Sequence, residues 1–494
     1  MPRPLEGRYW ATAAIVLLAL SPNIVVSTAF GAFQKTIEHH TGLGPTGATV
    51  VEELSNAGYA FGALVGGDLT QRFKQRYVFL SCEALFVAAS LLAAFSWGAI
   101  SFSVGRVLQG LATGFLLTAA IPPLVQLFPA RKLQLTAALI NVGFFGAVTT
   151  GPLLAGPSAI GAHHWRWFFA GIGLLGCAGL ALAAFSLPTK PPPNPELPPD
   201  WPAFGLAALG TVAPFVGVGL LVSRAFSSPG FTGLVGGGTI ALVTLLVLEY
   251  RKREPLSPVR PMSTSVPVLG TLVASIAGAI YVTLLVLDGE YLAQVAHDTP
   301  LTAGDLTWPQ VVTVVLAASI FYVLVRRRSR HIATFVLLGL LALAAAGGLL
   351  TGIARLDAGA VTLGATALLG FGAGATVSPA LWLAGWATPV KLVGRVFALI
   401  ELIRSEVDYV LAPIMRHVAH GSAAATGLSH GFTYAIWLTF LVALAAIVLC
   451  VGIYLASGVR PERPDLETYL EGGEPGLDSP PFLARLRAEG AQAS

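Results

Sequence analysis

The chain has 494 residues, of which 55% are hydrophobic and only 11% are charged, and its mean hydropathy is +0.74. This composition excludes a water-soluble globular protein, because too few polar side chains remain to cover a surface. The formal net charge of +4 is modest, so its distribution along the chain is more informative than its size.

Apolar stretches long enough to cross a bilayer recur from Tyr9 to Leu455. A helical crossing needs about 20 such residues. Because the stretches are too long and unbroken for the strands of a membrane barrel, the sequence predicts an all-α polytopic membrane protein. The fourteen predicted transmembrane helices are residues 9–31, 50–71, 77–97, 100–124, 134–156, 166–187, 202–223, 229–249, 265–288, 305–325, 332–354, 360–386, 394–416 and 432–456.

Basic residues are distributed unevenly over the loops between these segments. With the N-terminus in the cytoplasm, 18 Lys and Arg residues before the tail lie on the cytoplasmic side and five lie at the outer ends. The positive-inside rule therefore predicts that both termini are cytoplasmic, in a multi-pass protein of the cytoplasmic (inner) membrane.

Prolines and charge divide the segments into blocks. A Pro-rich stretch cannot continue a helix and predicts a linker after the sixth segment. The next two segments are nearly uncharged and are expected to face lipid, and a final stretch without apolar periodicity predicts a largely disordered cytoplasmic tail. The predicted domains are a six-helix half (1–187), the linker (188–201), two inserted helices (202–250), a cytoplasmic loop (251–264), a second six-helix half (265–456) and the tail (457–494).

The loop after the second segment resembles the G-x-L-x-D-R-x-G-R-R loop of the major facilitator superfamily. The residues that agree are Gly67, Leu69, Arg72 and Arg76. Gln71 replaces the acid of the pattern, which leaves Asp68 as its substitute. The resemblance implies a conformational role for this loop and its charge contacts with neighbouring helix ends, and a simple basic loop is the alternative.

A buried arginine is the next feature along the chain. An Arg within a membrane costs about 2.5 kcal/mol or more, so it normally faces a wet cavity or a partner. Arg106-Val107-Leu108-Gln109-Gly110 resembles the R-x-x-Q-G motif of the same superfamily. The resemblance implies that Arg106 takes part in proton coupling and that Gln109 and Gly110 support it; a structural bridge to another helix is the alternative.

The fifth segment is rich in Gly and Pro. Its Gly143, Gly146, Gly151-Pro152 and Gly156-Pro157 resemble the G-x-x-x-G-P motif of proton antiporters. Small residues let helices approach closely and Pro bends a helix, so a hinge and close packing are equal alternatives. His164-Trp165-Arg166-Trp167 then resembles a signature of the fourteen-span drug:proton antiporter branch. The resemblance runs from about residue 9 to 456 and implies a major facilitator fold of two six-helix halves plus two inserted helices.

The first segment departs from that branch, because Ser21-Pro22-Asn23 stands where an Asp is usual. A carboxylate for proton exchange must therefore lie elsewhere, and Asn23 remains a candidate residue of the substrate cavity. Residues 401–408 are the best replacement, since Glu401, Arg404 and Asp408 share one helix face about 60° wide. They are expected to form i,i+3 and i,i+4 ion pairs with one carboxylate left to titrate. Structural pairing alone, or a stretch outside the bilayer, are the alternatives.

Further acids and aromatic residues complete the candidate site. Glu406 points about 140° away from Glu401. Solvated loop positions are the alternative for the acids at the ends of other segments. These remaining candidates are Asp288 and Glu290 for proton coupling, and Glu52, Glu53, Trp382 and Trp386 for the substrate cavity.

These features favour a proton-coupled secondary transporter that exports hydrophobic or amphiphilic small molecules by alternating access. The missing first-segment acid motivates the alternative of an importer or facilitator of an anion, metabolite or lipid, with Arg106, Arg404 and the tryptophans recognising it. A membrane-bound sensor is a third reading, and no pattern indicates an enzyme. The expected partners are the substrate, protons and the lipid bilayer, with no nucleic acid, no cofactor, no metal and a monomer as the simplest assembly; Cys82, Cys177 and Cys450 lack metal-ligand spacing.

Overall fold

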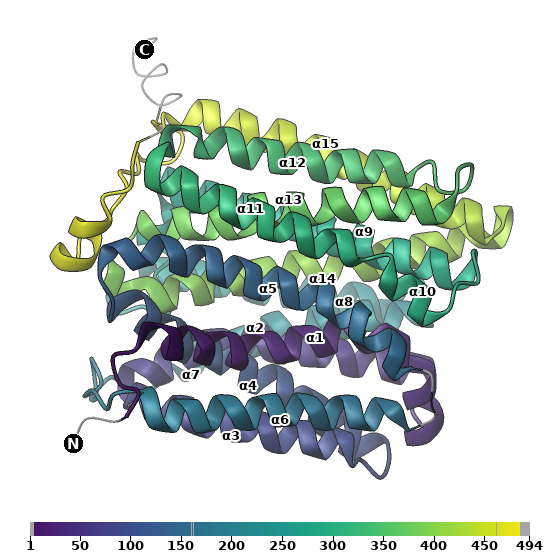
Figure 1. Ribbon diagram of the computed structural model, residues 1–494, viewed down its shortest axis with the longest axis horizontal. Coiled ribbons are helices and arrows are strands. Elements are labelled where there is room, and N and C mark those ends of the chain that lie inside the picture. The colour runs from purple at the N-terminus through teal and green to yellow at the C-terminus, as the bar shows by residue number, and fades with distance from the viewer. Residues whose placement is uncertain (1–3, 160, 162, 461, 485–494) are drawn as a thin grey trace. The chain divides into compact units, whose positions relative to one another are not determined.

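The computed structural model describes residues 4–159, 161, 163–460 and 462–484 (Figure 1). Two compact units divide the chain. Unit 1 comprises Met1–Leu127, Ala147–Ser257 and Asp298–Asp305, and unit 2 comprises Phe128–Gly146, Pro258–His297 and Leu306–Ser494.

The predicted all-α fold class is confirmed. Within the described residues, fourteen helices have 19 residues or more, and each contains most of one predicted segment. Several helices continue beyond the apolar stretch into polar residues, which hydropathy alone does not detect. The helices are α1 (Tyr9–Thr41), α2 (Pro45–Arg72), α3 (Gln75–Ala94), α4 (Ala99–Gln126), α5 (Ala130–Ser158), α6 (His164–Ser186), α7 (Trp201–Gly219), α8 (Pro229–Arg251), α9 (Ser265–Gln294), the short α10 (Pro300–Asp305), α11 (Trp308–Arg327), α12 (Ile332–Leu350), α13 (Ala358–Trp386), α14 (Val393–Thr426) and α15 (Leu428–Ser457).

Two of the long helices differ from the others in composition. Twelve helical stretches of the described chain are long and apolar enough to cross a membrane, and α2 and α14 are not among them. These two have 28 and 34 residues, but charged and polar side chains interrupt their apolar sequence. They carry most of the ionisable groups of the candidate site.

In unit 1, α2 and α4 pack closely through small residues. A methyl group in place of Gly110 would overlap the main-chain oxygen of Ser55, and one at Gly62 would lie 2.5 Å from the oxygen of Leu111. Glycine allows helix backbones to approach in this way. The contact fixes which residues of α2 lie opposite those of α4.

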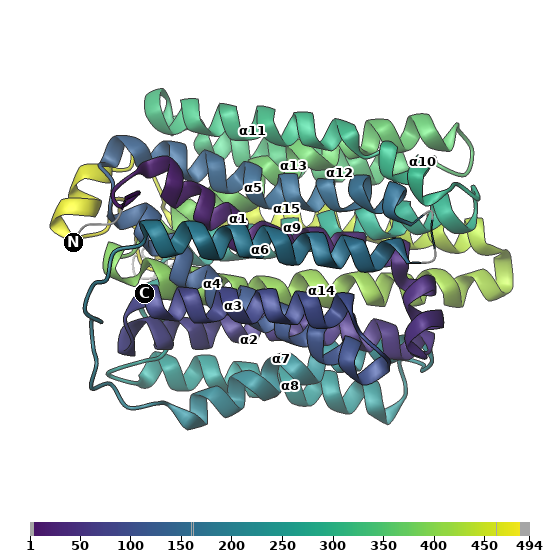
Figure 2. The same cartoon turned by 60° about the horizontal axis from the view of Figure 1, so that its bottom comes forward.

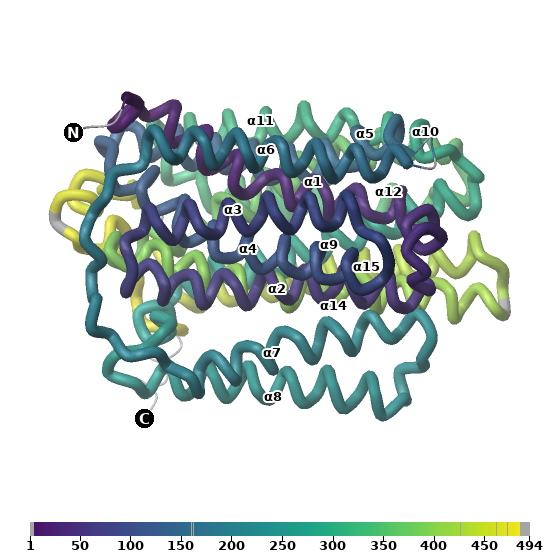
Figure 3. Tube along the Cα trace, turned by 90° about the horizontal axis from the view of Figure 1, so that it is seen from below, coloured from purple at the N-terminus to yellow at the C-terminus, as the bar shows by residue number. Residues whose placement is uncertain are grey.

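The inserted helices α7 and α8 lie side by side and group with unit 1 (Figure 3). Gly210 of α7 packs on Leu242 of α8, and Gly219 lies against Val50 of α2. Large apolar side chains such as Ile240, which is 69% exposed, cover their outer face. Such an apolar, nearly uncharged face suits contact with lipid.

Ion pairs connect the end of α8 to the start of α7. The Lys252 ammonium, just after α8, contacts both Asp200 and Glu249, and Asp200 also accepts a hydrogen bond from the Ala203 N–H at the start of α7. Burial alone would lower the pKa of Lys252, but the hydrogen bonds to Asp200 and Glu249 raise it above its ordinary value.

In unit 2, α9 packs against α13, α14 and α15, and α13 also packs against α11 and α12. Figure 2 shows α11 and α13 side by side. The predicted halves differ from the two units at two places. Residues 128–146 at the start of α5 group with unit 2, and residues 298–305 group with unit 1.

The tail differs from the prediction of disorder. Of its described residues, Leu466 and Tyr469 are buried, and the N–H of Gly476 donates to the oxygen of Trp386 at 2.8 Å. Ser265 at the start of α9 donates its N–H to the oxygen of Pro480 at 2.9 Å. Main-chain hydrogen bonds of this kind require no apolar periodicity, so the sequence pattern did not reveal them.

Candidate functional site

Arg106 and Glu52 form the centre of a polar cluster in unit 1. The Arg106 Nη2 lies 2.6 Å from Glu52 Oε2 and 2.8 Å from Oε1, and its Nε lies 3.2 Å from Oε2. Arg106 is fully buried, and the Glu52 side chain is 13% exposed. The ion pair joins α4 to α2, so the structural bridge that the sequence left open exists.

The remaining donors of Arg106 are used by neutral groups. Nη1 donates to Gln109 Oε1 at 2.7 Å, and Nη2 donates to Ser27 Oγ at 3.3 Å. The Gln109 amide in turn donates to Ser90 Oγ at 2.8 Å. The rings of Phe30 and Phe169 lie 5.9 and 5.8 Å from the guanidinium, a distance at which an aromatic face attracts a cation.

Gly110 explains the spacing between the arginine and the glycine in the R-x-x-Q-G motif. Arg106 lies one turn before Gly110, where α4 touches Ser55 of α2. Glu52 lies nearly one turn before Ser55, so the close approach at Gly110 brings Glu52 and Arg106 within ion-pair distance. The glycine thus positions the pair.

Other acids and amides of unit 1 are also buried. Asn23 is 5% exposed and Glu53 is 8% exposed. Sequence reasoning missed Glu83, which is fully buried in α3, and its two oxygens have no hydrogen-bond partner within the described chain. Gly179 of α6 makes room for it, because a methyl group there would lie 2.7 Å from Oε1. A lone acid in an apolar segment is the sequence signal that could have identified this position.

Two side chains at the start of α3 contact main-chain oxygens of α4 and of the end of α6. Arg76 donates to the oxygens of Ala184 and Leu187 at 3.0 and 3.3 Å, and Gln75 donates to the oxygen of Ala119 at 3.0 Å.

An internal ion pair holds the preceding turn of α2. Asp68 lies 2.5 Å from Arg72 and is 2% exposed, so the substitute acid is paired. A methyl group at Gly66, beside Gly67, would lie 2.5 Å from Thr118 Oγ1 of α4, which shows how closely this turn is packed.

The Gly-Pro stretch of α5 is a packing surface where it lies in unit 1. A methyl group at Gly151 would overlap Thr28 of α1, and one at Gly156 would lie 2.8 Å from Leu301 of α10. A methyl group at Gly304 would likewise lie 2.5 Å from the main-chain oxygen of Pro152. No atom lies within 4 Å of a methyl group at Gly146 among the described residues, so Gly146 is not needed for close approach.

In unit 2, Arg404 lies between two carboxylates on α14. Its Nη2 is 2.5 Å from Glu401 Oε2, and its Nη1 contacts Asp408 Oδ2. The predicted i,i+3 and i,i+4 ion pairs are therefore present. Asp408 is fully buried and occupies space left by Gly278 of α9, where a methyl group would lie 2.6 Å from both carboxylate oxygens. Within the described chain, Glu406 Oε1 has no hydrogen-bond partner.

Helix α9 carries further acidic contacts. Thr362 donates to Asp288 Oδ1 at 2.8 Å, and both residues are buried. Glu290 pairs with Arg416 at 2.5 Å and lies 3.5 Å from the His420 ring nitrogen.

Three buried neutral polar side chains, one each on α5, α9 and α11, were not identified from the sequence. Gln310 donates to the Tyr281 hydroxyl, and Asn141 donates to the oxygen of Gly374 at 2.8 Å. All three side chains are buried, and Gln310 Oε1 and Asn141 Oδ1 have no partner within the described residues. Buried amide oxygens usually have partners, so these two are candidates to accept hydrogen bonds from a ligand.

The two candidate tryptophans lie at the end of α13. Trp382 and Trp386 are 2% and 0% exposed, and Trp386 stacks on Phe321 with ring centroids 6.3 Å apart. The tail covers the main-chain oxygen of Trp386. Among the described residues, no three or more His, Cys, Asp or Glu side chains lie together in a way that could hold a metal ion.

Comparison with known proteins identifies relatives of most of the helical region. Residues 16–413 match the family described as the Major Facilitator Superfamily. The chain is 32% identical over 281 residues to YubD, an uncharacterized MFS-type transporter of Bacillus subtilis strain 168, covering 56% of this chain and 54% of that protein. It is 27% identical over 392 residues to a multidrug resistance protein B homolog of Mycobacterium tuberculosis H37Rv, covering 76% of this chain and 70% of that protein. The chain thus spans about half the length of the first relative.

A solved structure shows the same fold. The proton:xylose symporter XylE aligns with a TM-score of 0.61 over 94% of this chain and 98% of its own, at 14% identity.

Proposed function

Because the chain belongs to the Major Facilitator Superfamily, we propose that it is a proton-coupled exporter of hydrophobic or amphiphilic small molecules that works by alternating access. The chain is a multi-pass membrane transporter and not an enzyme. We further propose fourteen crossings, cytoplasmic termini and a place in the cytoplasmic membrane as a monomer, in keeping with the distribution of basic loops.

The charge balance of the α14 cluster is the observation that carries this proposal. Arg404 supplies one positive charge, and Glu401 and Asp408 supply two negative charges when ionised. A buried group with an excess negative charge gains stability by taking up a proton or a cation. One proton neutralises the cluster, so proton uptake and release there can favour different conformations.

The proton gradient supplies enough free energy for such a cycle. Each charge that crosses 100 mV is worth about 2.3 kcal/mol. Protonation of the α14 cluster on one side of the membrane and deprotonation on the other would drive the outward movement of substrate. The relatives named as multidrug resistance proteins support export of such compounds.

The alternative is an importer or facilitator of an anion, metabolite or lipid. Asn23 favours it, because a buried amide in α1 cannot neutralise a cationic substrate as an acid would. Under this alternative Arg106 and Arg404 would recognise the anion. The pairing of both arginines with carboxylates opposes it.

Reconstitution into liposomes with an imposed pH gradient tests the proposal. Lumenal pH is followed while a panel of cationic, neutral and anionic amphiphiles is added. We expect at least one compound to move protons, and we expect Asp408→Asn and Glu401→Gln to reduce that movement. Glu254→Gln, in the exposed loop after α8, is the matched control and should behave as the parent protein.

This experiment distinguishes the proton-coupled exporter from the facilitator. Antiport is wrong if no compound moves protons and both variants transport normally. Uptake of an anion down its own gradient without proton movement would establish the facilitator instead.

A further inference from the structure

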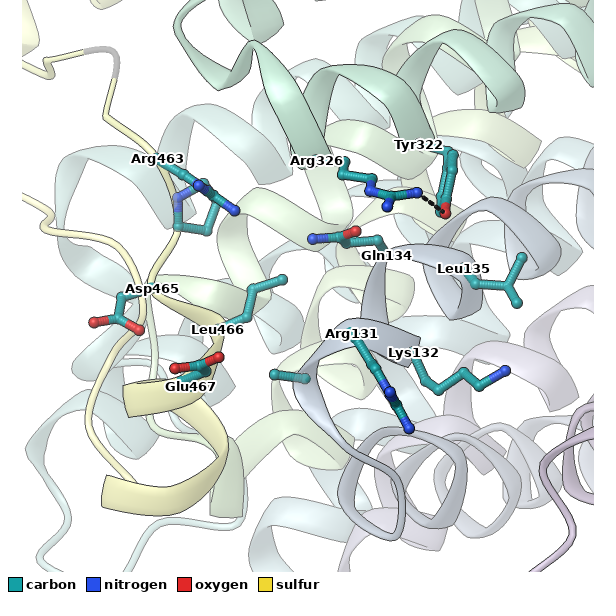
Figure 4. A pocket seen from close by; sticks show the side chains of 12 residues that line it. Arg131, Lys132, Gln134, Leu135, Tyr322, Arg326, Arg463, Asp465, Leu466 and Glu467 are labelled. Atoms are coloured by element: carbon teal, nitrogen blue, oxygen red, sulfur yellow. Dashed lines mark hydrogen bonds between the residues drawn. The ribbon is translucent and has the colours of Figure 1, made fainter.

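A pocket of about 900 Å³ lies in unit 2, apart from the clusters described above. The start of α5, the end of α11 and the tail form its walls (Figure 4). Its basic residues are Arg131, Lys132, Arg326 and Arg463, and its acids are Asp465 and Glu467. Four positive charges against two negative charges leave a net charge of +2.

The arginines around this pocket are not neutralised by the protein. Arg131, Arg326 and Arg463 form no ion pair within the described residues, and Arg326 only donates to the Tyr322 hydroxyl at 3.3 Å. Asp465 is occupied in another way, since it accepts hydrogen bonds from the N–H and hydroxyl of Thr468. These three exposed guanidinium groups, from separate segments, together with Lys132 outnumber the two acids of the pocket, so the site attracts an anion.

Contacts between the tail and the rest of unit 2 keep Arg463 at the pocket. Tyr469 is fully buried, and the hydroxyl of Ser479 accepts from the N–H of Val266 at 2.9 Å. The pocket therefore exists only while the tail is docked, and an anion there would link the tail to α5 and α11.

The surface next to the pocket indicates the rest of the ligand. Val312, Val315 and Val323 of α11 are 56%, 44% and 47% exposed. At 100° per residue they point within about 60° of Arg326. An exposed apolar strip thus leads directly to the basic pocket, as required for a molecule with a charged head and an acyl chain.

From this arrangement we infer that the pocket binds the phosphate of an anionic phospholipid, with its acyl chains along the exposed face of α11. Guanidinium groups match phosphate geometry, and Arg131, Arg326 and Arg463 supply three of them along the walls of the pocket. Basic pockets at the ends of membrane helices commonly bind such headgroups. This inference does not depend on the transported substrate.

The test uses the purified full-length protein in neutral detergent. Phosphatidylglycerol or phosphatidylcholine is added, and both thermal unfolding and the lipid retained in native mass spectrometry are measured. We expect phosphatidylglycerol alone to raise the unfolding temperature and to remain bound. The double variant Arg131→Gln/Arg326→Gln should bind it about tenfold or more weakly.

Arg327→Gln/Arg328→Gln is the matched control, because both residues are exposed at the same end of α11 and neither lines the pocket. The control should retain the parent affinity. Equal weakening in both double variants would overturn the inference in favour of general surface attraction. An equal shift with inorganic phosphate or glycerol 3-phosphate would overturn the lipid assignment.

Discussion

Two ion-paired arginines, one in α4 and one in α14, differ in charge balance. Arg106 in unit 1 has one carboxylate partner, Glu52, and its other donors meet neutral oxygens. Arg404 in unit 2 is shared by Glu401 and Asp408. A balanced pair needs both charges to remain, whereas a cluster with an extra carboxylate tolerates, and even favours, a proton. We therefore propose a positioning role for the first and proton exchange for the second.

Glu52→Gln is expected to have the largest effect on stability. It leaves Arg106 buried and charged without an acid, and an arginine cannot lose its proton in a protein. Removing one partner of a buried ion pair costs about 3 to 5 kcal/mol. Thermal or denaturant unfolding of the purified protein measures this loss.

A double variant checks the cause. Arg106→Gln/Glu52→Gln removes both charges and should recover a large part of the stability that Glu52→Gln loses. If the double variant is as unstable as the single one, the ion pair is not what Glu52 contributes.

Gly278→Ala should have the next largest effect, in unit 2. Its methyl group would lie 2.6 Å from both oxygens of Asp408, so the carboxylate must move away from Arg404. Inserting a methyl group into such a site costs about 1 to 3 kcal/mol. Gly289→Ala, on the same helix with open space around it, is the control for unfolding measurements and should change stability by far less.

Hydropathy was sufficient to predict the helices but not the contacts between them. The ion pairs of Arg404 could be predicted because they lie within one helix, three and four residues apart. The pairing of Arg106 with Glu52 spans 54 residues, and no local pattern encodes it. The close approach of the two helices at Gly110 of α4 and Gly62 of α2 explains this pairing, and it is visible only in the folded structure.

The neutral and irregular parts were harder to predict. Gln310 and Asn141 carry no charge, so they did not stand out among polar residues, although both are buried. The tail is held by contacts such as that between Gly476 and Trp386, which depend on main-chain geometry and not on side-chain type.

Lys252→Met is expected to lower stability by about 1 kcal/mol, because the ammonium is one-third exposed and solvent screens its contacts with Asp200 and Glu249. Arg253→Met, the exposed neighbour, is the control. The pKa of Lys252 is raised in the folded protein, so its contribution is present below about pH 10.4 and disappears only above that value. A loss of this contribution already at neutral pH would contradict the assigned contacts.

Asp408→Asn should have the smallest effect on stability, although it should reduce proton-coupled transport. Arg404 keeps Glu401 at 2.5 Å after the substitution, and the change removes an excess negative charge from a buried place. We therefore expect a stability within about 0.5 kcal/mol of the parent, or higher. The same unfolding measurement is compared with that of Glu52→Gln. Equal destabilisation by the two substitutions would show that both clusters need all their charges, and the distinction between a positioning pair and a proton-exchanging cluster would not hold.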